Sequence, residues 1–250
     1  MAKQQAEYQR RMVLVRREEV KGELGVVTYT KFTEDEYLVR LRRAVDILKT
    51  KLAEPRYIEA KTEQAKLIAY FMERAVQLGE AAYRVKTVPV ALDIFLRVIC
   101  DDFIRLYWVA QSEKNAADYA KRTISEMAKL VRVSLEGGHA RIRNTKTGQD
   151  ATAAMLKVLP SFASPSKSTE QMAKDCGLEK IYVIPFRGSS FTVHGNTFKF
   201  PSLEGAEMVA FPAIIGFVNL VSAVADGYPD KLPSAKEVLA MLGPRKSAVA

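Results

Sequence analysis

Cysteine and histidine are both scarce in this chain, with two of each among 250 residues. Cys100 and Cys176 stand in unrelated contexts, and no CxxC pair or Cys/His cluster is present, so no zinc site is expected. Cys100 lies within an apolar helical pattern, where it most simply acts as a small buried hydrophobe. The histidines, His139 and His194, lie far apart in the sequence.

Three other sequence signatures are missing, and each absence argues against one kind of site or one location. No glycine-rich loop of the kind that binds phosphates is present, and no nucleophile elbow supports a serine-hydrolase triad. The first residues, MAKQQAEYQRR, contain no apolar segment that would mark a signal peptide. A cytoplasmic location is therefore the expectation.

Acidic residues are outnumbered by basic ones, 29 to 38, which leaves a formal charge of +9. Such an excess favours polyanionic partners, namely RNA, DNA or an anionic membrane face. The chain is 48% hydrophobic and 27% charged, which is typical of a folded soluble protein. Its length suits one large domain or two small ones.

One long run without charge stands out, MVAFPAIIGFVNLVSAVA at Met208–Ala225. Its 18 residues are at the lower limit for crossing a membrane. Pro212 and Gly216 interrupt it, and no cluster of lysine or arginine flanks it. We therefore expect a buried core helix, with a membrane span as the alternative.

Apolar spacing predicts a mostly α-helical chain, with an up-and-down helical bundle over residues 33–245 behind a basic N-terminal arm over residues 1–32. In the arm, residues 26–32 (VVTYTKF) have the composition of a strand. Capping boxes at Thr33/Glu36 and Ser234/Glu237, prolines and the Gly137-Gly138 pair delimit the predicted helices. These helices cover about 33–55, 57–83, 87–110, 115–135, 151–159, 168–175, 208–225 and 234–243.

The sequence HARIRNTKTGQD, residues 139–150, is the strongest candidate for a loop that contacts phosphates. It carries Arg141, Arg143 and Lys146 without an acid before Asp150. A basic loop that is merely solvated is the alternative. Arg10 and Arg11 of the arm are further candidate RNA contacts.

Arg97, Asp101 and Arg105 stand four residues apart on the polar side of the third predicted helix. This spacing predicts a ladder of ion pairs on a solvated face. A functional role for the same residues is the alternative.

The stretch FRGSSFTVHG, Phe186–Gly195, places Arg187 seven residues before His194. On a helix the two side chains would share one face about 10 Å apart, with Ser190 between them. The pattern aromatic-Arg-x-x-Ser-x-x-Val-His-Gly, followed by a last apolar helix, resembles an uncharacterised, abortive-infection-like branch of the HEPN superfamily. ALDIFLRVICDDFIRLYWVA, residues 91–110, resembles the central helix of that branch, in which an arginine and an acid stand four apart. The resemblance covers roughly residues 60–225.

The resemblance implies a metal-independent endoribonuclease without a cofactor, in which transfer of the phosphoryl group to the RNA 2′-hydroxyl leaves a cyclic phosphate. Arg187 and His194 would be the catalytic residues, with Ser190 orienting the phosphate. It also implies a homodimer, in which the arginine of one copy meets the histidine of the other. Such a protein would act as a defence toxin in the cytoplasm, with an antitoxin or a regulatory protein as a further partner.

Two other readings remain open from the same residues. KIYVIPF (residues 180–186) and SSFTVHGNTFKF (residues 189–200) have strand-like composition, which predicts a small β-hairpin near residues 180–200 and would separate Arg187 from His194. Gly188 stands where the arginine of the family is usually followed by a polar residue. Both features favour a non-catalytic helical module that binds RNA, a nucleotide or a protein. A membrane-associated protein is a third reading.

Overall fold

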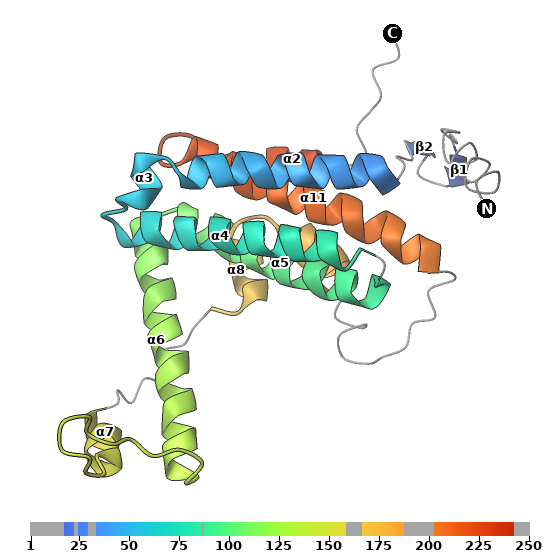
Figure 1. Cartoon of the computed structure of the whole chain (residues 1–250). Helices are drawn as coiled ribbons and strands as arrows, with labels where there is room; N and C mark the ends of the chain where they lie inside the picture. The colour runs from blue at the N-terminus through green and yellow to red at the C-terminus, as the bar shows by residue number, and fades with distance from the viewer. Residues whose placement is uncertain are drawn as a thin grey trace.

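The computed structural model describes residues 18–22, 25–29, 34–86, 88–158, 167–187 and 203–242. Within these ranges the chain is mainly helical, as the apolar spacing predicts (Figure 1). The arm contributes one hairpin, β1 (Glu18–Gly22) and β2 (Gly25–Tyr29), which pair antiparallel. The strand expected at residues 26–32 is thus present over its first part.

Four long helices form the bundle. They are α2 (Glu34–Leu52), α4 (Glu63–Arg84), α5 (Pro89–Ala110) and α11 (Leu203–Gly227). Each packs against the next in the cycle α2, α4, α5, α11, and α11 returns to α2 and closes the bundle (Figure 1). The cycle works because each helix carries an apolar stripe wide enough to meet two neighbours.

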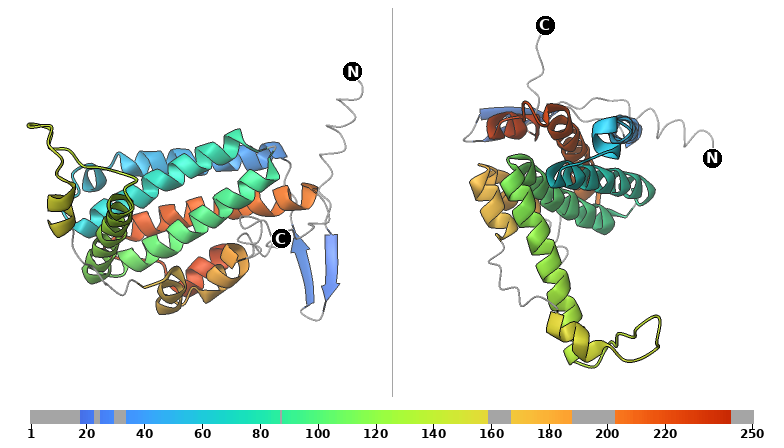
Figure 2. Two further views of the ribbon diagram at one scale, coloured as in Figure 1. Left: turned by 90° about the horizontal axis from the view of Figure 1, so that it is seen from below. Right: turned by 90° about the vertical axis from the view of Figure 1, so that its left-hand side faces the viewer.

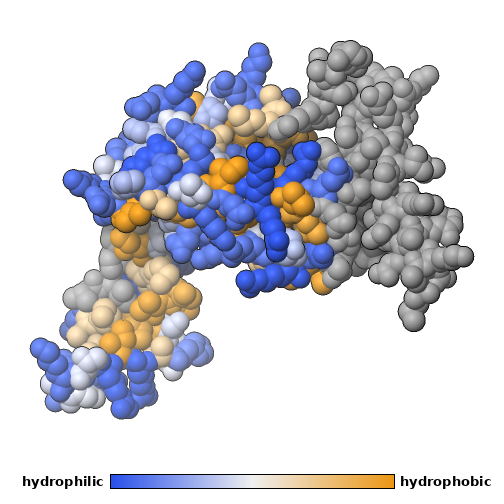
Figure 3. All heavy atoms as spheres, turned by 45° about the horizontal axis from the view of Figure 1, so that its top comes forward, coloured by the Kyte–Doolittle hydropathy of each residue, from blue (hydrophilic) through white to orange (hydrophobic). Residues whose placement is uncertain are grey.

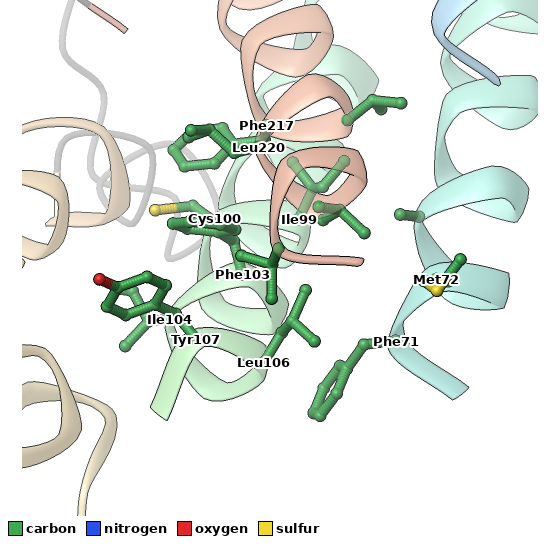
Figure 4. Close-up of a cluster of buried hydrophobic side chains, with 14 of the residues drawn as sticks. Phe71, Met72, Ile99, Cys100, Phe103, Ile104, Leu106, Tyr107, Phe217 and Leu220 are labelled. Atoms are coloured by element: carbon green, nitrogen blue, oxygen red, sulfur yellow. The ribbon is translucent and has the colours of Figure 1, made fainter. Parts of the chain in front are cut away.

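The centre of the bundle is filled by large apolar side chains from three of these helices. Phe71 and Met72 come from α4, Phe103 from α5, and Phe217 and Leu220 from α11 (Figure 4). The rings of Phe103 and Phe217 lie 5.7 Å apart, centroid to centroid. Apolar side chains surround most of α5, which agrees with its central position in the bundle.

The long uncharged run forms α11, which packs on α2, α4 and α5. Its segment Ala210–Gly227 is long and apolar enough to cross a membrane, but 56% of that segment is buried inside the structure. Val218 and Val224 are fully buried there. α11 is a core helix of the bundle, as the sequence predicts.

The helix predicted at residues 57–83 is two helices, so that prediction is wrong in its boundaries. A short helix, α3 (Pro55–Ile58), precedes α4, and Thr62 caps α4 by accepting a hydrogen bond from the backbone N–H of Ala65. The side-chain cap provides a partner for a backbone amide that has none inside the helix. The apolar spacing continues across the break, which is why the pattern alone conceals it.

One helix leaves the bundle. α6 (Glu113–Glu136) follows Ser112, whose hydroxyl caps it by accepting a hydrogen bond from the backbone N–H of Asn115, and it contacts α4 and α5. Its remaining length projects from the bundle, and α7 (Thr152–Val158) packs at its far end (Figures 1 and 2). We call α6, α7 and the loop between them the projecting arm.

The remaining helices are short and cover the outside of the bundle. They are α8 (Thr169–Asp175), α9 (Glu179–Ile181), η1 (Tyr182–Phe186) and α12 (Ala235–Leu242). α8 and η1 pack on α5, and α12 packs on α11. The hairpin expected near residues 180–200 is contradicted over residues 180–187, which are helical; residues 188–200 lie outside the described ranges. Ile181 is buried in the core in this helical arrangement, and packing of this kind outweighs the local strand composition.

Candidate functional site: an arginine and aromatic surface around Arg187

Arg187 follows a π-helical turn that proline imposes. Pro185 has no backbone N–H, so it cannot bond to the carbonyl of Ile181 as an α-helix would require. The backbone N–H of Arg187 instead reaches the carbonyl of Tyr182, and the thiol of Cys100 on α5 contacts the carbonyl of Ile181 at 3.7 Å. Wide turns of this kind occur often at functional sites. Pro185 therefore sets the direction in which Arg187 leaves the bundle.

Two arginines and two aromatic rings stack on this surface. The rings of Tyr182 and Phe186 lie 5.0 Å apart, nearly parallel. The guanidinium carbon of Arg187 lies 5.4 Å from the centre of the Tyr182 ring, and that of Arg97, on α5, lies 5.2 Å from the Phe186 ring. Each cation is attracted to the negative face of its ring. The stack fixes both guanidinium groups and keeps them on one surface.

Glu170, on α8, is the acidic neighbour of Arg187. Its carboxylate lies 3.9 Å from the guanidinium, which is longer than a hydrogen bond. Its bond and ion pair with Lys174, at 2.9 Å, lower the pKa of Glu170 most, and the charge of Arg187 and the hydroxyl of Tyr182 lower it further. The side chain of Arg187 is 58% exposed. The N–H donors of Arg187 therefore face solvent. Among the described residues one carboxylate, that of Glu170, lies near them, beyond hydrogen-bond distance.

α8, which carries Glu170, also packs beside an ion pair of α5 that we expected on a solvated face. Arg105 and Asp101 pair at 2.6 Å as the spacing predicts, but both are largely enclosed by α8. The hydroxyl of Thr169 donates to Asp101 at 2.7 Å and lies 3.5 Å from Arg105. Burial lowers the pKa of Arg105, but Asp101 and Tyr119 more than offset burial and raise it overall. The predicted ion pair is confirmed for Asp101 and Arg105, but the prediction of a solvated face is wrong there, because α8 packs on this part of α5.

The predicted catalytic residues are described only in part. Arg187 is the last of the described residues in its segment, whereas Ser190 and His194 lie outside the described ranges. The spacing of about two turns between Arg187 and His194 thus stays a prediction. Arg10 and Arg11 also lie outside the described ranges.

The predicted phosphate-contacting loop lies at the far end of the projecting arm. Arg141, Arg143 and Lys146 are all exposed. The carboxamide oxygen of Asn144 accepts hydrogen bonds from two backbone amides, at 2.8 and 3.2 Å, and residue Asp150 pairs with Arg143 in an antiparallel bridge. The loop is therefore an ordered turn that presents three cations. The structure does not bring it together with Arg187.

A groove of about 470 Å³ runs between α2 and α4, on another part of the bundle. Three of its charged side chains are already engaged, since Lys49 pairs with Glu80 at 2.6 Å and Arg42 lies over the Tyr83 ring. Within the described ranges no three histidine, cysteine or acidic side chains gather in a way that would hold a metal ion.

Sequence reasoning missed three residues of this surface. Tyr182 and Phe186 stand four apart, which is the helical spacing for ring stacking, but a strand-like composition concealed it. Glu170 has no signal in the sequence, because only the packing of α8 brings it to Arg187.

The fold and this surface define a helical-bundle protein with an exposed arginine and aromatic surface. A model of a family of unknown function (DUF5677) matches residues 65–203, more than half of the chain, and the chain belongs to that family. The matched segment runs from α4 into the start of α11 and includes both Arg187 and the loop of the projecting arm. Comparisons with curated proteins and with solved structures gave no match.

Proposed function

We propose that this protein is a metal-independent endoribonuclease of the HEPN kind, with Arg187 as the residue that binds the scissile phosphate. The observation that supports it best is the placement of Arg187: exposed, oriented by Tyr182, and on the same surface as Arg97. A guanidinium is always charged and offers a planar fork of donors that suits phosphate oxygens. The helical conformation up to Arg187 agrees with the helical motif that the resemblance implies.

The reaction needs little more than positioned charge and proton transfer. The 2′-oxygen of the ribose bonds to phosphorus, the bond to the 5′-oxygen breaks, and a 2′,3′-cyclic phosphate remains. A base takes the proton of the 2′-hydroxyl, and an acid gives one to the departing 5′-oxygen. His194 suits one of these roles at neutral pH, and Arg187 stabilises the negative charge that develops on the phosphate oxygens.

Seven residues of helix hold an arginine and a histidine about 10 Å apart, which is too far for both to act on one phosphate. A second copy of the chain solves this in a symmetric pair, because it brings its own histidine toward the Arg187 of the first copy. The proposed site is therefore composite.

The experiment that tests this function is cleavage of a mixed RNA pool by the purified protein in EDTA. The expected products end in a cyclic phosphate and are absent with His194→Ala at an equal concentration of folded protein. Cleavage that needs a divalent cation, or that continues unchanged in His194→Ala, would contradict the proposal.

A non-catalytic RNA-binding function is the second candidate, and the loop of the projecting arm favours it. Arg141, Arg143 and Lys146 are exposed on an ordered turn that is well separated from Arg187. Contacts from such side chains to phosphates fix affinity without reading sequence. This function would survive the loss of His194.

If the loop binds RNA, its affinity should lose salt dependence when the three cations become glutamine. Each phosphate contact on a single strand contributes about 0.7 to the slope of log K against log salt, so the triple variant should have a slope shallower by about 2. Fluorescence anisotropy with a labelled single strand at several salt concentrations measures it.

A matched control removes three exposed cations from the bundle by Arg43→Gln, Lys61→Gln and Lys66→Gln. Its net charge equals that of the loop variant. Equal slopes for both variants would show that the excess charge of the whole protein, and not the loop, attracts RNA.

A further inference from the structure

The projecting arm carries a row of apolar side chains on its surface. Ile124, Met127, Leu130 and Val133 of α6 are 58%, 58%, 62% and 57% exposed. They recur at every third position and cover about 13.5 Å of the helix at 1.5 Å per residue. We call them the α6 ridge. Exposed apolar side chains that stand together, unlike ones scattered singly, mark sites of interaction.

The bundle does not cover the ridge. The buried side chains of α6 are Ala116 and Tyr119 near its root, and Ala128 and Leu135 in its distal half, where α7 packs. Apolar side chains gather along the projecting helix in the space-filling view (Figure 3). The helix therefore has an amphipathic face without a partner in the described part of the chain.

The chemistry of the ridge excludes nucleic acid as the occupant of this face. RNA binds where cations meet phosphates, and the cations of the projecting arm lie in the loop beyond the ridge, at Arg141, Arg143 and Lys146. Side chains at every third position instead form a ridge that is inclined to the helix axis. Such a ridge fits the groove between rows of side chains four residues apart on a second helix, and the two helices then cross at about 20°. The ridge is shaped for another helix.

We propose that α6 packs antiparallel against α6 of a second copy of this chain. A two-fold axis at the middle of the ridge places Met127 of each copy opposite Leu130 of the other and sets Ile124 level with Val133 of the other copy. Glu126 and Lys129 flank the ridge, are both exposed and stand three apart. In this register Glu126 of each copy lies within reach of Lys129 of the other.

The self-complementary charges are the reason to choose a second copy over an unrelated helix. An antiparallel pair repeats each contact twice, so one acid and one base per chain give two ion pairs. The bundles then lie at opposite ends of the paired arms and do not obstruct each other, since α6 projects clear of them (Figure 1).

This contact is separate from the composite site, because the ridge is on α6 and Arg187 follows η1. The α6 contact alone gives dimers. The α6 contact together with the contact at the composite site gives larger assemblies. The proposal does not depend on RNA cleavage.

Charge exchange tests the contact without disturbing the fold. Glu126→Lys alone places lysine against Lys129, and Lys129→Glu alone places glutamate against Glu126, so each variant should have half the mass of the unaltered protein by light scattering. An equimolar mixture of the two variants restores both ion pairs and should regain the full mass. Leu130→Glu should also halve the mass, and no mixture should restore it.

Arg43→Glu, a charge reversal at an exposed position on α2 of the bundle, is the control and should leave the mass unchanged. A far-ultraviolet spectrum identical to that of the unaltered protein shows that each variant is folded. The proposal is overturned if the unaltered protein is a monomer up to about 100 µM, or if the mixture of the two variants keeps the lower mass.

Discussion

Arg187→Ala is expected to lower the rate of RNA cleavage by about 100-fold or more, with a smaller change in the apparent affinity for RNA. The charge on the phosphate oxygens grows as the 2′-oxygen attacks, and removal of one positioned donor at such a site typically costs a factor of 10² to 10³. The loop of the projecting arm is untouched by this change and continues to hold RNA. Single-turnover cleavage of a labelled RNA in EDTA separates the rate from the affinity.

Arg187→Lys discriminates a fork of donors from a point charge. Lysine keeps the positive charge, but it loses the planar geometry that matches two phosphate oxygens. We therefore expect only partial recovery relative to alanine. Arg43→Ala, which removes an exposed arginine from α2, is the control and should cleave at the full rate.

A different pattern would contradict the assignment of Arg187. If Arg187→Ala cleaves at the rate of the unaltered protein, Arg187 is a structural partner of Tyr182 and Glu170 and does not bind the scissile phosphate. If Arg187→Ala loses affinity and not rate, the residue binds RNA equally in the ground state and the transition state.

The bundle was predictable because its signals are local and repeated. The apolar spacing of α5 and the absence of charge in Met208–Ala225 identify helices that must be buried, and both are central in the structure. Ser234 and Glu237 form the expected capping box at α12, with the backbone N–H of Ser234 donating to Glu237 at 2.8 Å. Local chemistry decides these features, and the sequence displays it.

The site was predictable only at Arg187, because its other members depend on packing between distant segments. Asp101 and Arg105 were identified as a pair, but their burial comes from α8, some 65 residues later. The strand-like composition before Arg187 gave way to a helix because Ile181 enters the core and Pro185 accommodates a wide turn. No periodicity in one segment encodes a contact with another.

Arg74→Met is expected to destabilise the fold by about 2 kcal/mol at pH 7, although Arg74 lies outside the proposed site. The Nε of Arg74 donates to Asp102 at 2.8 Å, and the side chain of Asp102 is only 10% exposed. Loss of one partner of a buried pair typically costs 3 to 5 kcal/mol, and about 2 is expected here because Arg74 itself is about a third exposed. Urea unfolding measures the loss.

The stability lost in Arg74→Met should shrink as the pH falls, because Asp102 then binds a proton. Burial raises the pKa of Asp102 above its ordinary value of 3.8, and Arg74 opposes that rise. Without Arg74 the pKa rises further, so the folded variant binds the proton more tightly than the unfolded chain does. Protonation of Asp102 therefore stabilises the folded variant. This stabilisation is complete below about pH 3.8 and is lost as the pH rises through the pKa of Asp102 in the folded variant. Unfolding at pH 4.5 and pH 7 compares the two regimes.

Replacement of both partners separates the buried charge from the lost packing. In the double variant Arg74→Met with Asp102→Leu no carboxylate stays buried without a partner, so most of the stability at pH 7 should return. Its stability relative to the unaltered protein should also lose the pH dependence that Arg74→Met alone shows. If the double variant is as unstable as Arg74→Met, the stacking of the Arg74 guanidinium over the Tyr70 ring, at 5.7 Å, is what the fold requires. The cost would then be the loss of this stacking, and Asp102 would be an incidental neighbour.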